Sequence, residues 1–196
     1  MNTCLHQIYY SPQSRAELDP GFLPLDNLSN PRPDWREYWP IRRFLLSNSL
    51  EPESYYGFLS PKFKHKTGLS SAAVYEFIGG QTERPDVLLF SPYFDQIAFF
   101  LNIVEQGCIN HPVMADTLNE AAALMFPGFR SGAIFAIAAN TVFCNNFVAK
   151  PRFWSEWLVL LHALKIAFVT QGVEHYSKAF LHLRNTIAKD LAKGSR

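Results

Sequence analysis

Hydroxyl, amine and carboxylate side chains follow directly after four apolar runs of the sequence. The segments are residues 10–12, 60–62, 91–95 and 149–151, and each has a proline within two residues of the end of its run. In open α/β sheets, ligands bind beyond the carboxyl ends of the strands. The repeated pattern therefore predicts one shared rim that binds a small ligand, although prolines also serve simply to end strands.

Asp95 is the carboxylate with the best position for chemistry. It lies four residues beyond the apolar run 86–91, where it could hold a divalent ion or meet sugar hydroxyls. The alternative role is to cap a helix that begins near Gln96. Asp86 lies at the other end of the same run, so we expect it to have a structural role.

Basic and amide side chains supply two further candidates. Lys62 stands before two other lysines, at 64 and 66, and this cluster could neutralise a phosphate, although short basic clusters are also typical of solvated surface. Asn145 and Asn146 are adjacent in a strand-prone run, so one side chain should face each side of the sheet. A buried asparagine needs hydrogen-bond partners, and ligand hydroxyls and backbone groups are the two alternatives.

Strand-prone runs alternate with runs of helical spacing along the chain. We expect strands at residues 5–10, 55–60, 86–91 and 143–149, and helices at residues 35–47, 71–78, 94–106, 115–125, 152–170 and 175–193. Pro40 predicts a kink or split in the first helix, and residues 18–33 should form an ordered loop. The alternation predicts an α/β fold with a mainly parallel sheet of about four strands covered by helices.

The composition is that of a globular protein, with one α/β domain expected over residues 1–196. Hydrophobic residues make up 48% and charged residues 18% of the chain, and the net charge is +1. Such a charge gives no long-range field for nucleic acid, so nucleic acid is not an expected partner. The motifs of nucleophile-elbow hydrolases, P-loop NTPases and Rossmann dehydrogenases do not occur in the sequence.

The sequence also indicates the cellular compartment in which the protein is expected. Its first residues lack a signal-peptide pattern, and the most apolar stretch, residues 131–148, is interrupted by three asparagines. The three cysteines form no CxxC pair, which favours free thiols in a reducing compartment. We therefore expect a cytoplasmic protein without a membrane span.

Several segments resemble a known family when they are taken in order. They are HQIYY, PLDN, YYGFLSPKFKHKTGLS, DVLLFSPYFDQ and FCNNFVAKPRFWSEWL. Together they are similar to small bacterial proteins of surface-polysaccharide synthesis related to GT-A-type glycosyltransferases. The resemblance covers roughly residues 5–160.

The resemblance implies a compact GT-A-like nucleotide-sugar-binding fold and transfer of a sugar from a nucleotide-sugar donor to a glycan acceptor. Its implied catalytic residue is Asp95, near a metal or sugar. The implied substrate-binding residues are Tyr9 and Tyr10 near the nucleotide, Tyr56, Ser60 and Lys62 at the edge of the site, Ser91 and Lys150 in the loops after two strands, and Asn145 and Asn146 near the acceptor.

The sequence departs from the family pattern in one respect that matters for catalysis. GT-A enzymes present an Asp-x-Asp triplet to a divalent ion such as Mn²⁺ or Mg²⁺, and this chain has no such triplet. The sequence therefore leaves three alternatives: a glycosyltransferase-like enzyme, a glycan-binding or accessory protein that keeps the fold without the chemistry, and a protein that uses its apolar helices in an oligomer.

Overall fold

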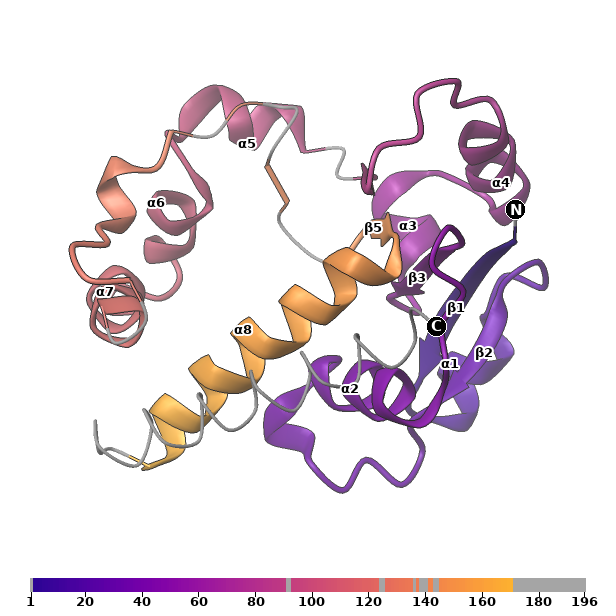
Figure 1. The fold of residues 1–196 in the computed structure, drawn as a ribbon, viewed down its shortest axis with the longest axis horizontal. Helices are drawn as coiled ribbons and strands as arrows, with labels where there is room; N and C mark the ends of the chain where they lie inside the picture. The colour runs from indigo at the N-terminus through magenta and orange to yellow at the C-terminus, as the bar shows by residue number, and fades with distance from the viewer. Residues whose placement is uncertain are drawn as a thin grey trace. The chain divides into compact units, whose positions relative to one another are not determined.

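The structure is a computed structural model that describes residues 2–90, 93–123, 126–135, 137, 141–142 and 145–170. The chain divides into two compact units (Figure 1). The first unit is Met1–Tyr93 with Val142–Trp154, and the second is Phe94–Thr141 with Ser155–Arg196. Whether the two units fold as the one expected domain stays a prediction, because compactness alone does not show that either folds by itself.

The first unit is built on an open, mixed sheet of five strands, which confirms the α/β class. The strands are β1 Thr3–Tyr9, β2 Leu23–Asp26, β3 Tyr55–Leu59, β4 Val87–Leu89 and β5 Phe147–Ala149, in the order β2-β1-β3-β5-β4. β1 pairs in parallel with β2 and β3, whereas β5 is antiparallel to both β3 and β4. Four strands therefore run in one direction, and β5 runs against them.

The strand missing from the sequence prediction is β2, which lies within the expected loop at residues 18–33. It is an edge strand that pairs with β1 alone. Pro24 and Asp26 occupy two of its four positions, and both residue types are rare in strands except at edges. The same residues keep the open edge from pairing with another chain.

One face of the sheet packs against α3 Phe63–Thr67 and α4 Ser71–Gly79. Leu5, Leu59 and Val148 from three neighbouring strands form one buried cluster with residues of these helices. Gly57 fits this tight face because a Cβ there would lie 2.9 Å from Cγ2 of Val148 and 3.0 Å from Cδ2 of Leu5. α4 begins after Ser70, whose hydroxyl caps it, so the helix expected from residue 71 is confirmed.

The other face packs against aromatic side chains from α2 Tyr38–Ser47 and from the start of α8 Pro151–Thr170. The Trp154 ring lies 4.8 Å from the Phe58 ring, and its Nε1 donates to the carbonyl oxygens of Tyr56 and Ala149. This hydrogen-bonded indole ties the start of α8 to two adjacent strands. Burying it with its N–H satisfied stabilises the sheet by packing without a polar cost.

The segment before α2 departs from the expected helix at residues 35–47. A short turn of 3-10 helix, η1 Pro33–Trp35, comes first, and α2 begins only at Tyr38. The break therefore precedes Pro40, which lies in the first turn of α2, where the missing N–H costs nothing. A second short helix, α1 Pro12–Ala16, follows β1 and is capped by Ser11.

The second unit is helical, with α5 Phe94–Phe99, α6 Ile103–Cys108, α7 Met114–Ala123 and η2 Ser131–Ala133. The expected helix at residues 94–106 is two helices because Asn102 caps α6: its Oδ1 accepts from the N–H groups of Val104 and Glu105. Its Nδ2 donates to the carbonyl oxygens of Ser131 and Ile134. One buried amide thus connects the start of α6 to the segment around η2, at the point where the chain passes from α5 to α6.

The remaining helix predictions divide in two. Those at 115–125 and 152–170 correspond to α7 and α8, whereas the one at 175–193 lies outside the described residues. Within the described part of the chain, none of the helices has the length and apolar character needed to span a bilayer.

Protonation of His6 should make the first unit less stable in acid. The ring is buried between Phe44 and Phe58, with centroids 4.5 and 5.5 Å away. Burial lowers the pKa of His6 below its ordinary value of 6.5, although hydrogen bonds to the backbone of Cys4 and Gly57 oppose this. The unfolded chain then binds the proton first, so stability falls as the pH drops through 6.5.

Urea unfolding between pH 7.5 and 5 measures this effect. We expect the free energy of unfolding to fall by up to about 1.4 kcal/mol per pH unit, and His6→Gln to flatten that dependence. The exposed His65 gives the matched control, His65→Gln, which should keep the wild-type slope. An unchanged slope in His6→Gln would contradict the assignment.

Candidate functional site

The candidate site is the edge of the sheet where β1, β2, β3 and β4 end, which we name the strand-end rim. The chain moves from β1 to β2 on one side and then to β3 on the other side of β1. The loops after β1 and β3 therefore leave in opposite directions. Such a switch point is where open α/β sheets bind ligands.

Gln7 holds these two loops together. Its side chain is buried, and its Nε2 donates to the carbonyl oxygens of Ser60 and Pro61 at 3.1 and 3.2 Å. Its Oε1 accepts from the N–H of Asp19 at 2.9 Å. The amide thus satisfies backbone groups of two loops that have no strand partner there. A polar residue within the apolar run 5–10 is the sequence signal that could have revealed it.

Asp19 fixes the loop after α1 to the start of α4. Its carboxylate accepts from the hydroxyl and the N–H of Ser71 at 2.5 and 3.0 Å, and from the N–H of Gly21 at 3.0 Å. Burial raises the pKa of Asp19, but these hydrogen bonds and the nearby Lys64 outweigh it and hold the pKa below its ordinary value. With three donors, the carboxylate has a structural role.

Tyr9 and Tyr10 lie at the end of β1, but they differ in access. Tyr9 is buried, with the Arg15 guanidinium 5.5 Å from its ring centroid. Burial and the neighbouring Asp26 raise the pKa of the Tyr9 hydroxyl. Tyr10 is 48% exposed, so its ring is the one of the two that could stack on a planar ligand.

Ser60 and Lys62 lie directly after β3. Ser60 is buried, and its hydroxyl accepts from the N–H of Lys62 at 3.3 Å, which shapes the turn. The Lys62 side chain is exposed, and no carboxylate pairs with it among the described residues. It is therefore a cation that an anionic ligand at the rim could use.

Asn145 and Asn146 reach the same rim because β5 runs against its neighbours, so that its start lies where β3 and β4 end. The carbonyl oxygen of Asn146 accepts from the N–H of Phe90 at 2.7 Å. Asn145 donates to Glu37 before α2, whereas Asn146 shares the face of Val148 and Phe90. β5 begins only at Phe147, so the two amides precede it instead of lying within the expected strand at residues 143–149, and they have different neighbours.

Asn146 is a polar group of the rim for which the described residues provide no side-chain partner. Its side chain is 0% exposed, and neither its Oδ1 nor its Nδ2 has a hydrogen-bond partner within the described part of the chain. A buried amide in this state costs about 1–3 kcal/mol. Fully buried polar groups without partners are rare in folded proteins. The exceptions often lie at functional sites.

Tyr56 and Lys150 lie at the opposite edge of the sheet, where β1, β3 and β4 begin and β5 ends. The hydroxyl of Tyr56 accepts from the N–H of Glu51 at 3.0 Å. Lys150 follows β5, and its N–H donates to the carbonyl of Asp86. The antiparallel direction of β5 thus separates Lys150 from Ser60, so the four proline-containing loops do not meet at one rim.

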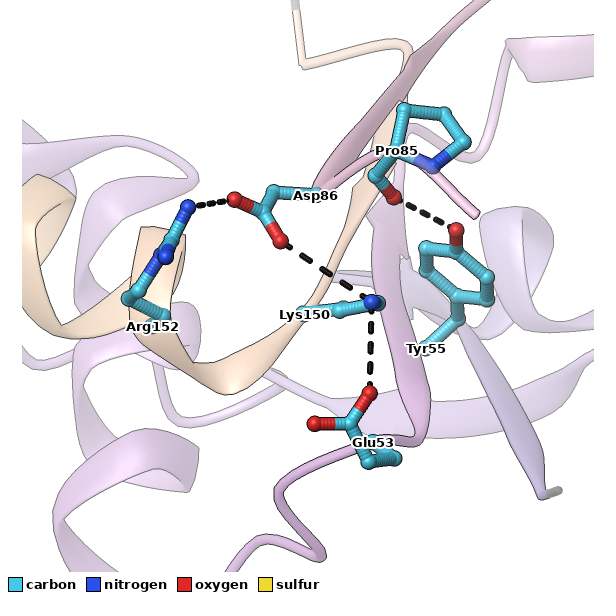
Figure 2. A network of polar contacts seen from close by, with 6 residues as sticks. All are labelled: Glu53, Tyr55, Pro85, Asp86, Lys150 and Arg152. Carbon is cyan, nitrogen blue, oxygen red and sulfur yellow. Dashed lines mark hydrogen bonds and ion pairs between the residues drawn. The ribbon is translucent and has the colours of Figure 1, made fainter. Parts of the chain in front are cut away.

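Figure 2 shows the polar network of this opposite edge. The Nζ of Lys150 lies 3.3 Å from Glu53 and 3.9 Å from Asp86, which also pairs with Arg152. The Lys150 side chain is only 12% exposed, so two carboxylates neutralise a largely buried cation. This confirms the structural role expected for Asp86. A hollow of about 550 Å³ lies beside the network, lined by Asn2, Glu51, Pro52, Glu53, Ser54 and Arg84.

Asp95 belongs to the second unit. It lies in the first turn of α5 and accepts from Nε2 of Gln96 at 3.0 Å. This hydrogen bond lowers the pKa of Asp95 more than its slight burial raises it. Ser91 lies outside the described residues. Among the residues that are described, no three histidine, cysteine or acidic side chains gather in a way that could hold a metal ion.

Comparison of the chain with protein-family models, with curated proteins and with solved structures found no match. A functional proposal for the chain therefore depends on the geometry of the strand-end rim and on the resemblance of its segments.

Replacing Gln7 should destabilise the first unit. Gln7→Met keeps the length of the side chain but leaves Pro61 O and Asp19 N without their partner, so we expect a loss of about 2–4 kcal/mol in the free energy of unfolding. The exposed Gln13 gives the control Gln13→Met, which should change it by less than about 0.5 kcal/mol. Equal effects of the two substitutions in urea unfolding would refute the role of Gln7 in holding the two loops together.

Replacing Asn146 should raise the free energy of unfolding, in contrast to the replacement of Gln7. Leucine has the branching of asparagine, with methyl groups in place of the amide oxygen and nitrogen, so Asn146→Leu removes an unsatisfied amide without leaving a cavity and should stabilise the fold by about 1–3 kcal/mol. Asn145→Leu, which breaks the hydrogen bond to Glu37, should give no gain. Thermal and urea unfolding measure both, and a destabilised Asn146→Leu would show that the amide has a partner in solution.

Proposed function

We propose that this chain is a glycosyltransferase-like protein that transfers a sugar from a nucleotide-sugar donor during bacterial surface-polysaccharide synthesis. The observation that carries the proposal is the strand-end rim at the switch point between β1 and β3. Its four co-directional strands are compatible with a compact GT-A-like nucleotide-sugar-binding fold. The ordered resemblance of segments along residues 5–160 supports the same class.

The rim offers the side chains that a nucleotide sugar needs. The exposed ring of Tyr10 can stack on a base or a sugar. Lys62 extends from the loop on the other side of the switch point, and its ammonium can pair with a diphosphate. Asn145, two residues before β5, carries an amide that can bind hydroxyl groups.

Charge stabilisation would supply most of the rate in such a reaction. As the bond from the sugar to the diphosphate breaks, negative charge develops on the departing phosphate oxygens. Lys62 is placed to stabilise that charge. The role that the resemblance implies for Asp95, meeting a metal such as Mn²⁺ or Mg²⁺ or a sugar hydroxyl, concerns a residue of the second unit, and it is not used at the rim.

A non-catalytic glycan-binding or accessory protein is the second candidate. The observation in its favour is the missing Asp-x-Asp triplet, which GT-A-type enzymes use to hold the ion that bridges the diphosphate. In this reading the rim binds a glycan, and the exposed aromatic ring and the amides supply the contacts.

Calorimetric titration with nucleoside diphosphates and nucleotide sugars, with and without Mn²⁺, tests the proposal. We expect saturable binding that weakens about 5–10-fold in Lys62→Ala, since an exposed charge pair contributes roughly 1 kcal/mol. Arg84→Ala, at the hollow of the opposite edge, is the control and should bind like the wild type. Binding that depends on Arg84 rather than Lys62 would place the ligand at the wrong edge, and binding of glycans alone would favour the accessory role.

A further inference from the structure

A carboxylate that the sequence did not single out lies at the strand-end rim. The Nδ2 of Asn145 donates to Oε2 of Glu37 at 2.7 Å, although 108 residues separate the two in the chain. Both side chains are half-buried, so each keeps access to the rim. The contact joins the start of β5 to the residue before α2.

The fold explains why Glu37 is at this edge. α2 leads toward β3, which begins at the opposite edge, so the start of α2 lies on the side of the strand-end rim. Glu37 directly precedes the helix, and Arg36 before it has a φ of 49°, in the left-handed region. This turn costs an arginine about 1–2 kcal/mol of backbone strain, which shows that the surrounding structure holds the segment in place.

Two other carboxylates of the first unit have donors or a cation supplied by the chain itself, and that of Asp26, at the end of β2, accepts from the N–H of Leu28 at 2.8 Å. Asp19 accepts from three donors, and Asp34 pairs with Arg32 at 2.8 Å. Glu37 accepts one hydrogen bond, at Oε2, and its Oε1 has no partner among the residues that the structure describes. Its one partner is a neutral amide, so its negative charge is not cancelled by a cation within those residues.

A carboxylate held by an amide is a hydroxyl-binding arrangement. An ionised carboxylate only accepts hydrogen bonds, so the side chain of Asn145 must turn its NH₂ group toward Glu37. That orientation leaves two acceptors unused in the described structure, Oε1 of Glu37 and Oδ1 of Asn145. Two adjacent acceptors suit a ligand with neighbouring hydroxyl groups.

We propose that Glu37 binds the acceptor hydroxyl of the sugar transfer and receives its proton, with Asn145 as a positioning residue. The inference rests on the proposed function. The acceptor oxygen forms a bond to the anomeric carbon, the bond from that carbon to the diphosphate breaks, and the diphosphate leaves with the electron pair. The hydroxyl proton passes to Oε1 of Glu37, so charge and atoms balance without a further reactant.

The test separates donor binding from transfer. The probes are UDP-glucose, UDP-galactose, UDP-N-acetylglucosamine and GDP-mannose. Calorimetry measures the affinity for each donor. Turnover is measured as the nucleoside diphosphate released when the sugar is transferred to water or to added oligosaccharides. We expect Glu37→Gln to bind the donor within about twofold of wild type but to turn it over at least about 100-fold more slowly, as for loss of a general base. It should also lose the acidic limb of the pH–rate profile.

Two further variants exclude a merely structural effect. Asn145→Ala should retain the acidic limb of the pH–rate profile and slow turnover about 10-fold, because the carboxylate is still present but no longer held. Glu51→Gln, an exposed carboxylate at the opposite edge, should behave like the wild type in both assays. Melting temperatures check that each variant folds.

The outcomes are distinguishable. If the wild type binds a donor and Glu37→Gln turns it over within about threefold of the wild-type rate, the role of Glu37 is refuted and the proposed function stands. If a donor binds but the wild type gives no turnover, the role is refuted and the accessory function is favoured. If none of the probes binds, both the proposed function and this inference fail.

Discussion

The direction of β5 is the constraint on which the rest of the first unit depends. It lies between β3 and β4 and runs against both, so among the strands that the structure describes β4 pairs with β5 alone. The reversal carries Asn145 and Asn146 to the edge where the other strands end, and it carries Lys150 to the opposite edge. The indole of Trp154 then fixes β5 to β3 through the carbonyl oxygens of Ala149 and Tyr56. One strand therefore decides which side chains share a site.

Two buried amides at the strand-end rim differ in how far the chain satisfies their hydrogen-bonding groups. Gln7 has each of its amide atoms engaged by backbone groups of the two loops that leave the switch point. Asn146, close to the same edge, has neither amide atom engaged within the described residues. The first amide is explained by folding alone, because without it the loops would carry unsatisfied backbone groups. The amide of Asn146 costs stability as it stands. A ligand hydroxyl or a rearranged loop would give it a hydrogen-bond partner.

The sequence was a good guide to elements that depend on local pattern. The strands β1, β3 and β4, the start of α4 at residue 71 and the helix after Pro151 were all predicted, because each follows from a few adjacent residues. The edge strand β2 was missed because Pro24 and Asp26 weaken its strand pattern, and tertiary pairing with β1 overrides that weakness. The break at Asn102 was missed because an asparagine within an apolar run can either continue a helix or cap the next one.

The candidate site was less predictable than the fold, for a physical reason. The order of strands and helices does not state the direction of a strand, so the sequence grouped Lys150 with Ser60 although they lie at opposite edges. Asn145 and Asn146 were singled out because consecutive residues of a strand must face opposite sides. Glu37 was not, since its significance arises from a contact with Asn145 that only the folded sheet creates. Side chains that act through long-range contacts carry no local sequence signal.

If the strand-end rim binds the ligand, a nucleotide sugar should protect the backbone amides of the rim from solvent. Hydrogen–deuterium exchange, followed by mass spectrometry with and without the nucleotide sugars used above, measures this protection segment by segment. We expect ligand to slow exchange at residues 10–12, at residues 60–62 and at the start of β5. Protection at residues 51–54 and at Arg84, which line the hollow of the opposite edge, or no protection in the first unit, would contradict it.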